Sequence, residues 1–178
     1  GAALTGGLDG TVQSAAYSAY LSAIEPYAFD VMIYDGAEST VQSAMMAFIR
    51  RIADEAGVYS QLVASGLSNP DSRFVVNVGS GVTLADGTEL TAAQATWWAG
   101  GALAGAKYNE SLTYASYPGA VKASPLLTSS GYEEALRAGK FVLFADDGVV
   151  KVEQDINSLV TFTEDIGEVF RKNRVMRL

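Results

Sequence analysis

Cysteine and histidine are both absent from this sequence of 178 residues. Without cysteine, the chain has no disulfide, no thiol nucleophile and no cysteine ligand for zinc, and it is compatible with a reducing compartment. Without histidine, its own residues cannot form a Ser-His-Asp triad, a Cys-His pair or a histidine-ligated metal site. These absences exclude most familiar hydrolase mechanisms. Together with the lack of a convergent catalytic cluster, they lead us to expect a protein that is not an enzyme and that uses no metal and no cofactor.

Charged residues and long apolar runs are also scarce. Charged residues make up 18% of the chain and hydrophobic residues 49%, a balance typical of a globular protein rather than a disordered one. The formal net charge is −8, so we expect no nucleic acid and no anionic membrane among the partners. No apolar run reaches the roughly 18 residues that a membrane-spanning helix needs.

The stretch Tyr27–Gly36, YAFDVMIYDG, is the one around which we expect the rest of the chain to pack. Asp30 is the only polar residue between Phe29 and Tyr34, which is too apolar for a strand with one solvated face. Such a run is typical of a strand in a parallel sheet that helices cover on both faces. We therefore predict a central strand here, and we expect Ile33→Ala to destabilise the protein by roughly 2–5 kcal/mol.

Helical and strand patterns alternate along the rest of the chain. Capping boxes at Ser39–Gln42, Thr91–Gln94 and Ser130–Glu133 predict three helix starts. The predicted helices cover residues 11–25, 39–56, 91–106, 130–138 and a final stretch from 163, and the predicted strands cover 27–36, 59–64, 73–78, 140–145 and 149–154. This alternation indicates the α/β class, and we predict a three-layer sandwich with a mostly parallel central sheet.

The domain boundary is predicted near Gly139, where alternating helices and strands give way to a hairpin. We predict an α/β domain over residues 1–138 and the beginning of a small α+β C-terminal domain, a hairpin plus a helix, over residues 139–178. The glycine-rich opening Gly1–Gly10 is interpreted as a linker, and because it lacks an initiating methionine we expect the chain to be cut from a longer protein.

Acidic residues at strand ends are the first candidates for chemistry. Asp35 and Glu38 follow the first strand, and Asp146 and Asp147 follow a later one. Open α/β sheets bind ligands at the carboxyl ends of their strands, and carboxylates can hold magnesium there. The simpler interpretation, which we favour, is that the Asp-Gly pairs at 35–36 and 147–148 form turns.

Glycine loops are the second candidates, for binding phosphate. The GSG at Gly79–Gly81 lacks the continuation of both the dinucleotide and the P-loop fingerprints. Gly6 and Gly7 precede a predicted helix, whose start can bind an anion, but a hinge is the simpler interpretation.

The predicted helix over residues 91–106 carries two further signals. Trp97 and Trp98 point about 100° apart on a helix, so we expect partial burial of the pair rather than a platform for a sugar. Gly100, Gly101 and Gly105 each cost a helix about 1 kcal/mol relative to alanine, which is tolerated where another backbone packs closely. We therefore expect close packing at these glycines.

Basic residues gather at the end of the chain, in RKNRVMRL. Four of the twelve lysines and arginines lie there: Arg171, Lys172, Arg174 and Arg177. They could meet phosphate, but in an acidic chain the better partner is an acidic patch on another copy. We predict that these four residues lie at intersubunit contacts.

Three motifs, in their order and spacing, resemble those of one protein family. LTGGLDG at Leu4–Gly10, SLTYASYPGA at Ser111–Ala120 and GVVKVEQDINSLVTF at Gly148–Phe162 look like the tail sheath protein of contractile phages, prophages and phage-derived bacteriocins. The FDVMIYDG strand and a long helix lie between the first two motifs, as in that family, and the resemblance covers nearly the whole chain.

The resemblance implies a structural subunit whose sheath domain has a subtilisin-like fold. The likeness to subtilisin concerns the fold and not the chemistry. It implies polymerisation around a tail tube and contraction that drives the tube through the target cell envelope. The implied partners are other copies of the subunit, the tail tube protein, and the baseplate and tail terminator proteins. The implied location is a virion tail or tail-like particle assembled in the bacterial cytoplasm. The family's terminal arms are not in this chain, so we expect the chain alone to be monomeric.

The residues themselves leave two other classes of function open. One is an α/β enzyme, which needs a convergent polar cluster that the sequence does not reveal. The alternative is a non-catalytic carbohydrate- or partner-binding α/β module that uses Trp97 and Trp98. An activity screen with metal chelation tests the first, and a glycan array tests the second.

Overall fold

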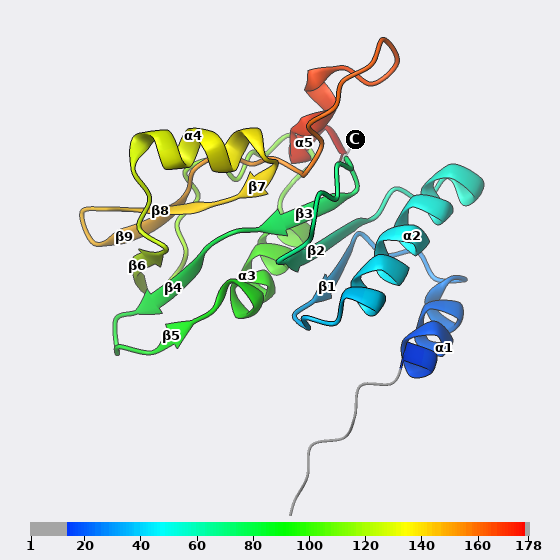
Figure 1. Ribbon diagram of the computed structural model, residues 1–178, viewed down its shortest axis with the longest axis horizontal. Coiled ribbons are helices and arrows are strands. Elements are labelled where there is room, and N and C mark those ends of the chain that lie inside the picture. The colour runs from blue at the N-terminus through cyan, green and yellow to red at the C-terminus, as the bar shows by residue number, and fades with distance from the viewer. Residues whose placement is uncertain (1–13, 177–178) are drawn as a thin grey trace, which may run out of the picture.

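The structure is a computed structural model that describes residues 14–176. Figure 1 shows a parallel sheet at the middle of the molecule and a smaller antiparallel part beside it. The helices are α1 Ser14–Ile24, α2 Ser39–Ala56, α3 Ala92–Gly105, α4 Ser129–Arg137 and α5 Asn173–Met176, together with the 3-10 helix η1 Glu168–Arg171. The Gly1–Gly10 linker prediction and the first sheath-like motif lie outside the described residues.

The central sheet has four strands, all parallel, in the order β1-β2-β3-β7. Their bounds are β1 Val31–Tyr34, β2 Gln61–Ser65, β3 Val75–Val78 and β7 Lys140–Phe141. In the register, Leu62 of β2 lies opposite Val75, and Asn77 of β3 lies opposite Lys140. The α/β class with a mostly parallel sheet is therefore confirmed, while a subtilisin-like arrangement stays a prediction.

Alternate residues of the strands feed two apolar clusters, one on each face of this sheet. On one face, Val63 and Val76 pack with Ala99 and Leu103 of α3. On the other face, Leu62 and Val75 pack with the apolar stripe of α2. That stripe was predicted and is buried throughout: Val41, Met45, Phe48, Ile49 and Ile52. The sheet is therefore covered by α2 on one face and by α3 on the other, and α1 packs beside α2 at the β1 edge.

The position predicted for the first strand is wrong. β1 lies at the edge of the sheet, and the central strands are β2 and β3. Ile33 on β1 is 41% exposed, because beyond this strand no further strand continues the sheet among the described residues. A continuous apolar run therefore marked a strand between two helical layers but did not distinguish the edge from the centre.

The glycines of α3 are only partly explained by close packing. A Cβ on Gly100 would lie 2.4 Å from Cγ1 of Ile33, so α3 approaches β1 closely at this point. The same expectation is wrong for Gly101 and Gly105, where a Cβ would meet no atom within 4 Å.

The helix starts test the predicted capping boxes. At α3 the box is confirmed, because the Gln94 backbone N–H donates to Oγ1 of Thr91 and the Thr91 backbone N–H donates to Oε1 of Gln94. At α2 the prediction is wrong, because Glu38 occupies the N-cap position and makes no side-chain cap. Gln42 is instead buried and donates to the carbonyl oxygens of Gly36 and Ser65.

The remaining helix start is also shifted. α4 is capped by Thr128, whose side chain accepts from the Gly131 backbone N–H, so the predicted box at Ser130–Glu133 is wrong. The C-terminal ends are better predicted: Gly57 ends α2 with φ 67°, and Gly139 follows α4 with φ 70°. These positive φ angles favour glycine, which lacks the Cβ that would clash there.

Two antiparallel sheets lie beside the parallel sheet. β4 Gly81–Leu84 pairs with β5 Glu89–Leu90 and with β6 Ala120–Ser124, and β8 Leu143–Asp146 forms a hairpin with β9 Val149–Val152. The hairpin with its Asp147-Gly148 turn is confirmed. β7, however, belongs to the parallel sheet although it follows Gly139, so the predicted division at this residue crosses a continuous sheet and stays a prediction.

Residues 156–176 contain no long helix. The amphipathic helix predicted from Thr163 is wrong, because only η1 and the single turn α5 are helical there. Val169 is 54% exposed, so the apolar positions that suggested the helix do not form a buried stripe. The segment is fixed to the domain by polar side chains instead.

Candidate assembly surface

The predicted basic residues differ in their surroundings. Lys172 and Arg174 are exposed, Arg171 is half-buried, and Arg177 lies outside the described residues. Lys172 and Arg174 flank Asn173, which is fully buried. The structure therefore brings two of the four predicted cations together on the surface, on either side of an anchored residue.

Asn173 is the anchor of this segment. Its Nδ2 donates to Oδ1 of Asp155 at 2.9 Å, and its backbone N–H donates to the Asp155 carbonyl oxygen at 3.2 Å. Gln61, the first residue of β2, donates from Nε2 to Oδ1 of Asn173 at 3.0 Å. Asn173 thus ties the basic segment both to the amino end of a central strand and to the segment around Asp155.

Asp155 extends this network to the sheath-like motifs. It is buried, its Oδ2 accepts the Leu112 backbone N–H at 3.0 Å, and its backbone N–H donates to Oγ1 of Thr113 at 3.0 Å. Leu112 and Thr113 belong to the motif at 111–120, and Asp155 belongs to the motif at 148–162. The two motifs therefore meet at one buried carboxylate, beside the basic segment.

A groove of about 380 Å³ opens over this network. Its walls combine hydroxyl groups and charges of both signs: Ser111, Thr113, Tyr114, Glu153, Gln154, Asp155, Ile156, Lys172 and Arg174. We call it the motif groove. The backbone segments that carry its charged groups are held by the Asp155–Asn173 network.

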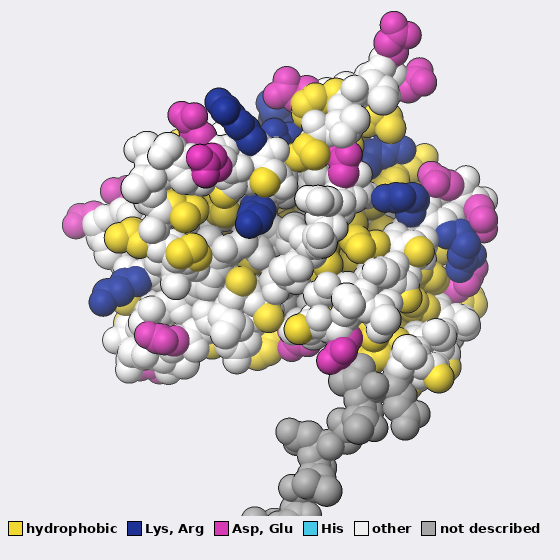
Figure 2. All heavy atoms as spheres, viewed as in Figure 1, with side chains coloured by type: hydrophobic (Ala, Val, Ile, Leu, Met, Phe, Trp, Pro, Cys, Tyr) yellow, Lys and Arg dark blue, Asp and Glu magenta, His cyan; other side chains and the backbone are white. Residues whose placement is uncertain are grey.

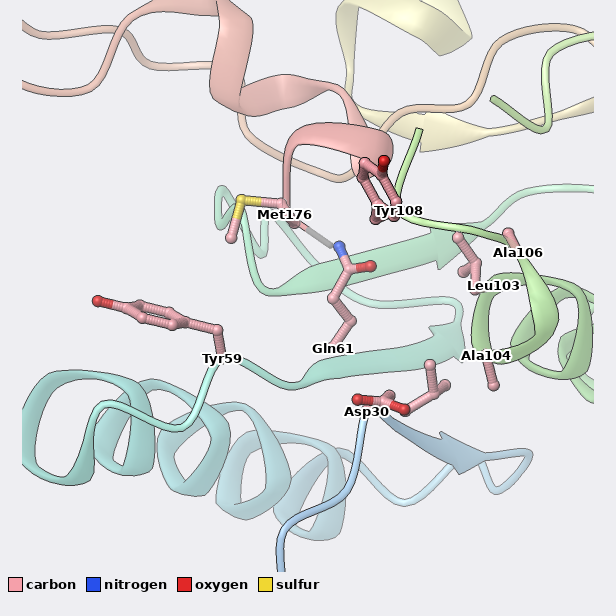
Figure 3. A pocket seen from close by; sticks show the side chains of 9 residues that line it. Asp30, Tyr59, Gln61, Leu103, Ala104, Ala106, Tyr108 and Met176 are labelled. Carbon is pink, nitrogen blue, oxygen red and sulfur yellow. The ribbon is translucent and has the colours of Figure 1, made fainter. Parts of the chain in front are cut away.

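A second hollow, of about 330 Å³, lies on the other side of α5 (Figure 3). Leu103, Ala104 and Ala106 from the end of α3 form one wall, and Gln61 lies at its centre. Tyr108 and Met176 lie above Gln61 in this view, and Asp30 lies below it. The hollow therefore marks the amino ends of β1 and β2, opposite the strand ends at which α/β enzymes bind ligands.

Arg171 is held differently from its basic neighbours. Its backbone carbonyl accepts the Asn157 N–H, while its side-chain Nε and Nη2 are buried without a hydrogen-bond partner among the described residues. Burial lowers the pKa of this guanidinium from its usual value, and the nearby Glu168 carboxylate opposes that shift. Arg171, the last residue of η1, is therefore partly withdrawn from solvent, unlike the exposed Lys172 and Arg174.

The acidic candidates for metal binding are separated or otherwise engaged. Asp35 accepts from Nε1 of Trp97 at 3.0 Å, and Asp146 pairs with Lys151 at 2.7 Å. Within residues 14–176, no group of three or more Asp and Glu side chains is placed to hold a metal ion. No described helix is long and apolar enough to cross a membrane.

The tryptophans form no joint platform. Trp97 is 49% exposed, whereas Trp98 is half-buried and packs on Tyr117 with ring centroids 4.5 Å apart. Partial burial of the pair is confirmed.

Figure 2 shows acidic and basic side chains interspersed over the visible face, with small apolar patches between them.

The buried polar network beneath the motif groove could not be predicted from the sequence. Asn173, Asp155 and Gln61 lie far apart in the chain, and none stands in a periodic apolar pattern that would predict burial. The only available signal was indirect, since Asp155 and Asn173 each lie in a segment already singled out, one by its motif and the other by its charge.

Comparisons with known proteins support the motif-based resemblance. Residues 10–158 match the family described as the phage tail sheath protein central domain. The chain is 40% identical over 181 residues to the phage-like element PBSX protein XkdK of Bacillus subtilis (strain 168), covering 100% of this chain and 39% of that protein. It is 24% identical to the tail sheath protein of Clostridium phage phiCD119, covering 88% of this chain and 43% of that protein.

Solved structures show the same fold. The sheath tail protein of Desulfitobacterium hafniense superposes with a TM-score of 0.91 at 44% identity, covering 94% of this chain and 40% of that one. The contracted helical sheath of the anti-feeding prophage gives a TM-score of 0.62 at 16% identity, covering 92% of this chain and 46% of that one, a likeness of fold alone. The chain thus spans about two fifths of the length of the curated relatives it matches.

Proposed function

The chain belongs to the phage tail sheath protein family, and we propose that it forms the central part of a structural subunit of a contractile tail sheath. The observation that carries the proposal is the family match over residues 10–158, which includes the whole parallel sheet. The full-length subunit polymerises around a tail tube and contracts to drive the tube through the envelope of the target cell.

The architecture suits a part that moves as one body. Contraction requires subunits to rotate while their interfaces exchange, and a rigid domain transmits such a rotation without deforming. Here both faces of the parallel sheet carry packed apolar clusters, and the C-terminal segment is fastened through buried polar side chains. This arrangement, together with the family, supports a structural role rather than an enzymatic one.

The partners and the location follow from this role. The subunit contacts other copies of itself, the tail tube protein, the baseplate and the tail terminator, in a virion tail or tail-like particle that assembles in the bacterial cytoplasm. Support comes from two structural neighbours of this fold, which are described as an anti-feeding prophage baseplate and a contracted helical sheath. We keep the division at Gly139 as a proposal, although the family match continues to residue 158.

The basic segment is proposed as an intersubunit contact. Stacked bodies of net charge −8 repel one another, and cations placed against a neighbour's acidic patch relieve that repulsion. Lys172 and Arg174 are exposed beside the motif groove, so they are the members best placed to reach a neighbour directly. We propose that the half-buried Arg171 and Arg177, which lies outside the described residues, belong to the same contact.

Charge reversal tests this contact. Arg174→Glu with Arg177→Glu in the full-length subunit should reduce the yield of sheaths while leaving the circular dichroism spectrum unchanged. The matched control is Arg137→Glu on α4, which is exposed and pairs only with Glu133 one turn away. Normal assembly of the double variant at all salt concentrations would contradict the electrostatic contact.

Electron microscopy of the full-length subunit tests the proposed function as a whole. The purified protein, alone and with tube protein, should form regular hollow tubes or rings of repeated subunits. A Leu62→Ala subunit, with its central strand weakened, provides a control for assembly that depends on the native fold. If the folded protein forms no ordered assembly with or without a tube, the sheath role is wrong.

A further inference from the structure

The β6–α4 loop, residues 125–128, carries the most exposed of the large apolar side chains of the described chain. Leu126 is 86% exposed, and Pro125 before it is exposed as well. Single exposed leucines are common on soluble proteins. This one stands between the end of β6 at Ser124 and the start of α4 at Ser129, and the proline ring restricts the backbone beside it. The loop therefore presents an apolar side chain next to a residue whose backbone is already restricted.

A groove of about 370 Å³ lies at the free edge of the parallel sheet, between α1 and β1. Its lining is largely aromatic and aliphatic, with Tyr17 and Tyr20 from α1 and with Ile33 and Tyr34 from β1. We call it the edge groove. Tyr20 is 48% exposed, so together with Ile33 it leaves apolar surface uncovered at this edge. Aromatic-lined hollows with exposed apolar surface are typical of contacts between proteins.

Exposed residues of opposite charge stand near the two features. Asp35 lines the edge groove, and Glu38 follows it on the same loop; both side chains are exposed. Lys122 lies on β6 four residues before Leu126, and it is exposed. Neither Glu38 nor Lys122 forms an ion pair with another residue between 14 and 176. Each charge is therefore available for a partner of the opposite sign.

From these observations we propose that Leu126 of one subunit inserts into the edge groove of a second copy, with Lys122 facing Glu38 across the contact. The inference rests on the proposed function, because it names one interface of that assembly. Figure 1 places the β6–α4 loop at the left end of the molecule and α1 at the right. Since the two surfaces differ and lie at different ends, the contact is heterologous, the kind that generates rings or helical arrays rather than closed dimers.

The contact is small. One loop in one groove buries far less than the roughly 1,000 Å² expected for a stable interface, so it does not hold two isolated chains together. It adds to other contacts once subunits are already side by side. The inference is therefore consistent with a chain that is monomeric alone, and it must be tested in the assembled particle.

Disulfide trapping tests the pair directly, because this chain has no cysteine of its own. The full-length subunit, with any cysteine outside this chain replaced by serine, is given Tyr20→Cys and Leu126→Cys together. After assembly and mild oxidation, denaturing gels should show a ladder of covalently linked subunits. Tyr20→Cys with Val149→Cys is the matched control, since Val149 is also exposed and lies in the β8–β9 hairpin. It should remain monomeric on the same gel.

The outcomes separate the two proposals. Assembled particles without a ladder from the 20/126 pair, or with an equal ladder from the control pair, would overturn this inference and leave the sheath role standing. Wild-type subunits that form no particles at all would overturn the sheath role, and this inference with it. If only the 20/126 variant fails to assemble, the charge swap below decides between a contact and a folding defect.

The charge swap uses Glu38→Lys and Lys122→Glu. Each single variant places like charges across the contact and should lower the yield of particles several-fold at low salt. The double variant restores opposite charges and should recover most of that yield. Failure of the double variant to recover, with both single variants folded by circular dichroism, would overturn the proposed pairing.

Discussion

β2 and β1 are neighbours in one sheet and have similarly apolar sequences, yet they occupy different environments. Leu62, Val63 and Ala64 of β2 are all fully buried, whereas Ile33 of β1 is 41% exposed. The difference comes from position in the sheet, since β2 has a strand on each side and β1, among the residues that the structure describes, has a strand on one side. The interior of the domain is stabilised by buried apolar side chains. At the periphery, the segment around Asn173 is held by hydrogen bonds between side chains.

The largest effect should come from truncating the interior. Leu62→Ala removes a fully buried side chain next to Val75, so we expect a loss of about 2–5 kcal/mol in the free energy of unfolding. Ile33→Ala at the edge should cost only about 1 kcal/mol, since much of that side chain is already in water. Urea denaturation of this chain measures both. Equal losses would show that exposure at the edge does not set the difference.

A smaller effect is expected where the periphery depends on hydrogen bonds. Asn173→Ala removes one hydrogen bond from Gln61 and one from Oδ1 of the buried Asp155, which should cost about 1–3 kcal/mol. The neighbouring Arg174→Ala is the control, because this exposed side chain makes no bond in the network. If thermal unfolding gives both variants the same midpoint, the network does not fasten the segment.

Helix caps give the next effect in size. Thr91→Ala removes the side-chain acceptor at the start of α3 and should cost about 1 kcal/mol. Ser39→Ala should change the unfolding free energy by no more than about 0.5 kcal/mol, because Ser39 is an exposed residue inside α2 rather than its cap. A loss at Ser39 as large as that at Thr91 would restore the capping box predicted from the sequence.

The smallest effect at neutral pH concerns Tyr34, whose buried hydroxyl has no hydrogen-bond partner among the described residues. Burial, with Tyr17 nearby, raises the pKa of Tyr34 above its usual 10.0. Below pH 10 the unfolded and folded chains both keep this group neutral. Above pH 10 the unfolded chain ionises first, so stability falls until the pH passes the folded pKa.

Tyr34→Phe removes this contribution. At pH 7 the variant should unfold within about 1 kcal/mol of the wild type, because the change breaks no hydrogen bond among the described residues. Between pH 9 and pH 11 it should lose less stability than the wild type as the pH rises. Urea titrations at each pH would measure this. Tyr117, whose pKa burial also raises, provides a second position for comparison through Tyr117→Phe.

Much of the fold could be predicted because it rests on local signals. The apolar stripe of α2, the Thr91 capping box and the Asp147-Gly148 turn each depend on residues within a few positions of one another. Strand order depends on pairing between distant segments, so nothing near Ile33 distinguishes an edge from a centre. The Gln61–Asn173 bond joins residues 112 positions apart, and no local pattern predicts such a contact.

The helix predicted from Thr163 fails for a related reason. Ile166, Val169 and Phe170 have helical spacing, but Phe170 instead packs under the guanidinium of Arg73, whose Cζ lies 5.3 Å from its ring centroid. Phe170 is therefore engaged in a tertiary contact with Arg73 instead of the apolar face of a helix. The exposed basic residues were predicted from composition, whereas their anchor was not, because a buried asparagine has no sequence signature of its own.

The anchoring of Asn173 has a mechanical consequence. A pull on the chain at this point does not peel the segment away one bond at a time, because the bonds to Gln61 and to Asp155 are loaded together. One path leads into the amino end of β2 and so along the parallel strands, and the other leads through Asp155 to the backbone at Leu112. Tension is divided between two parts of the domain, so we expect the segment to act as a fixed attachment rather than a hinge.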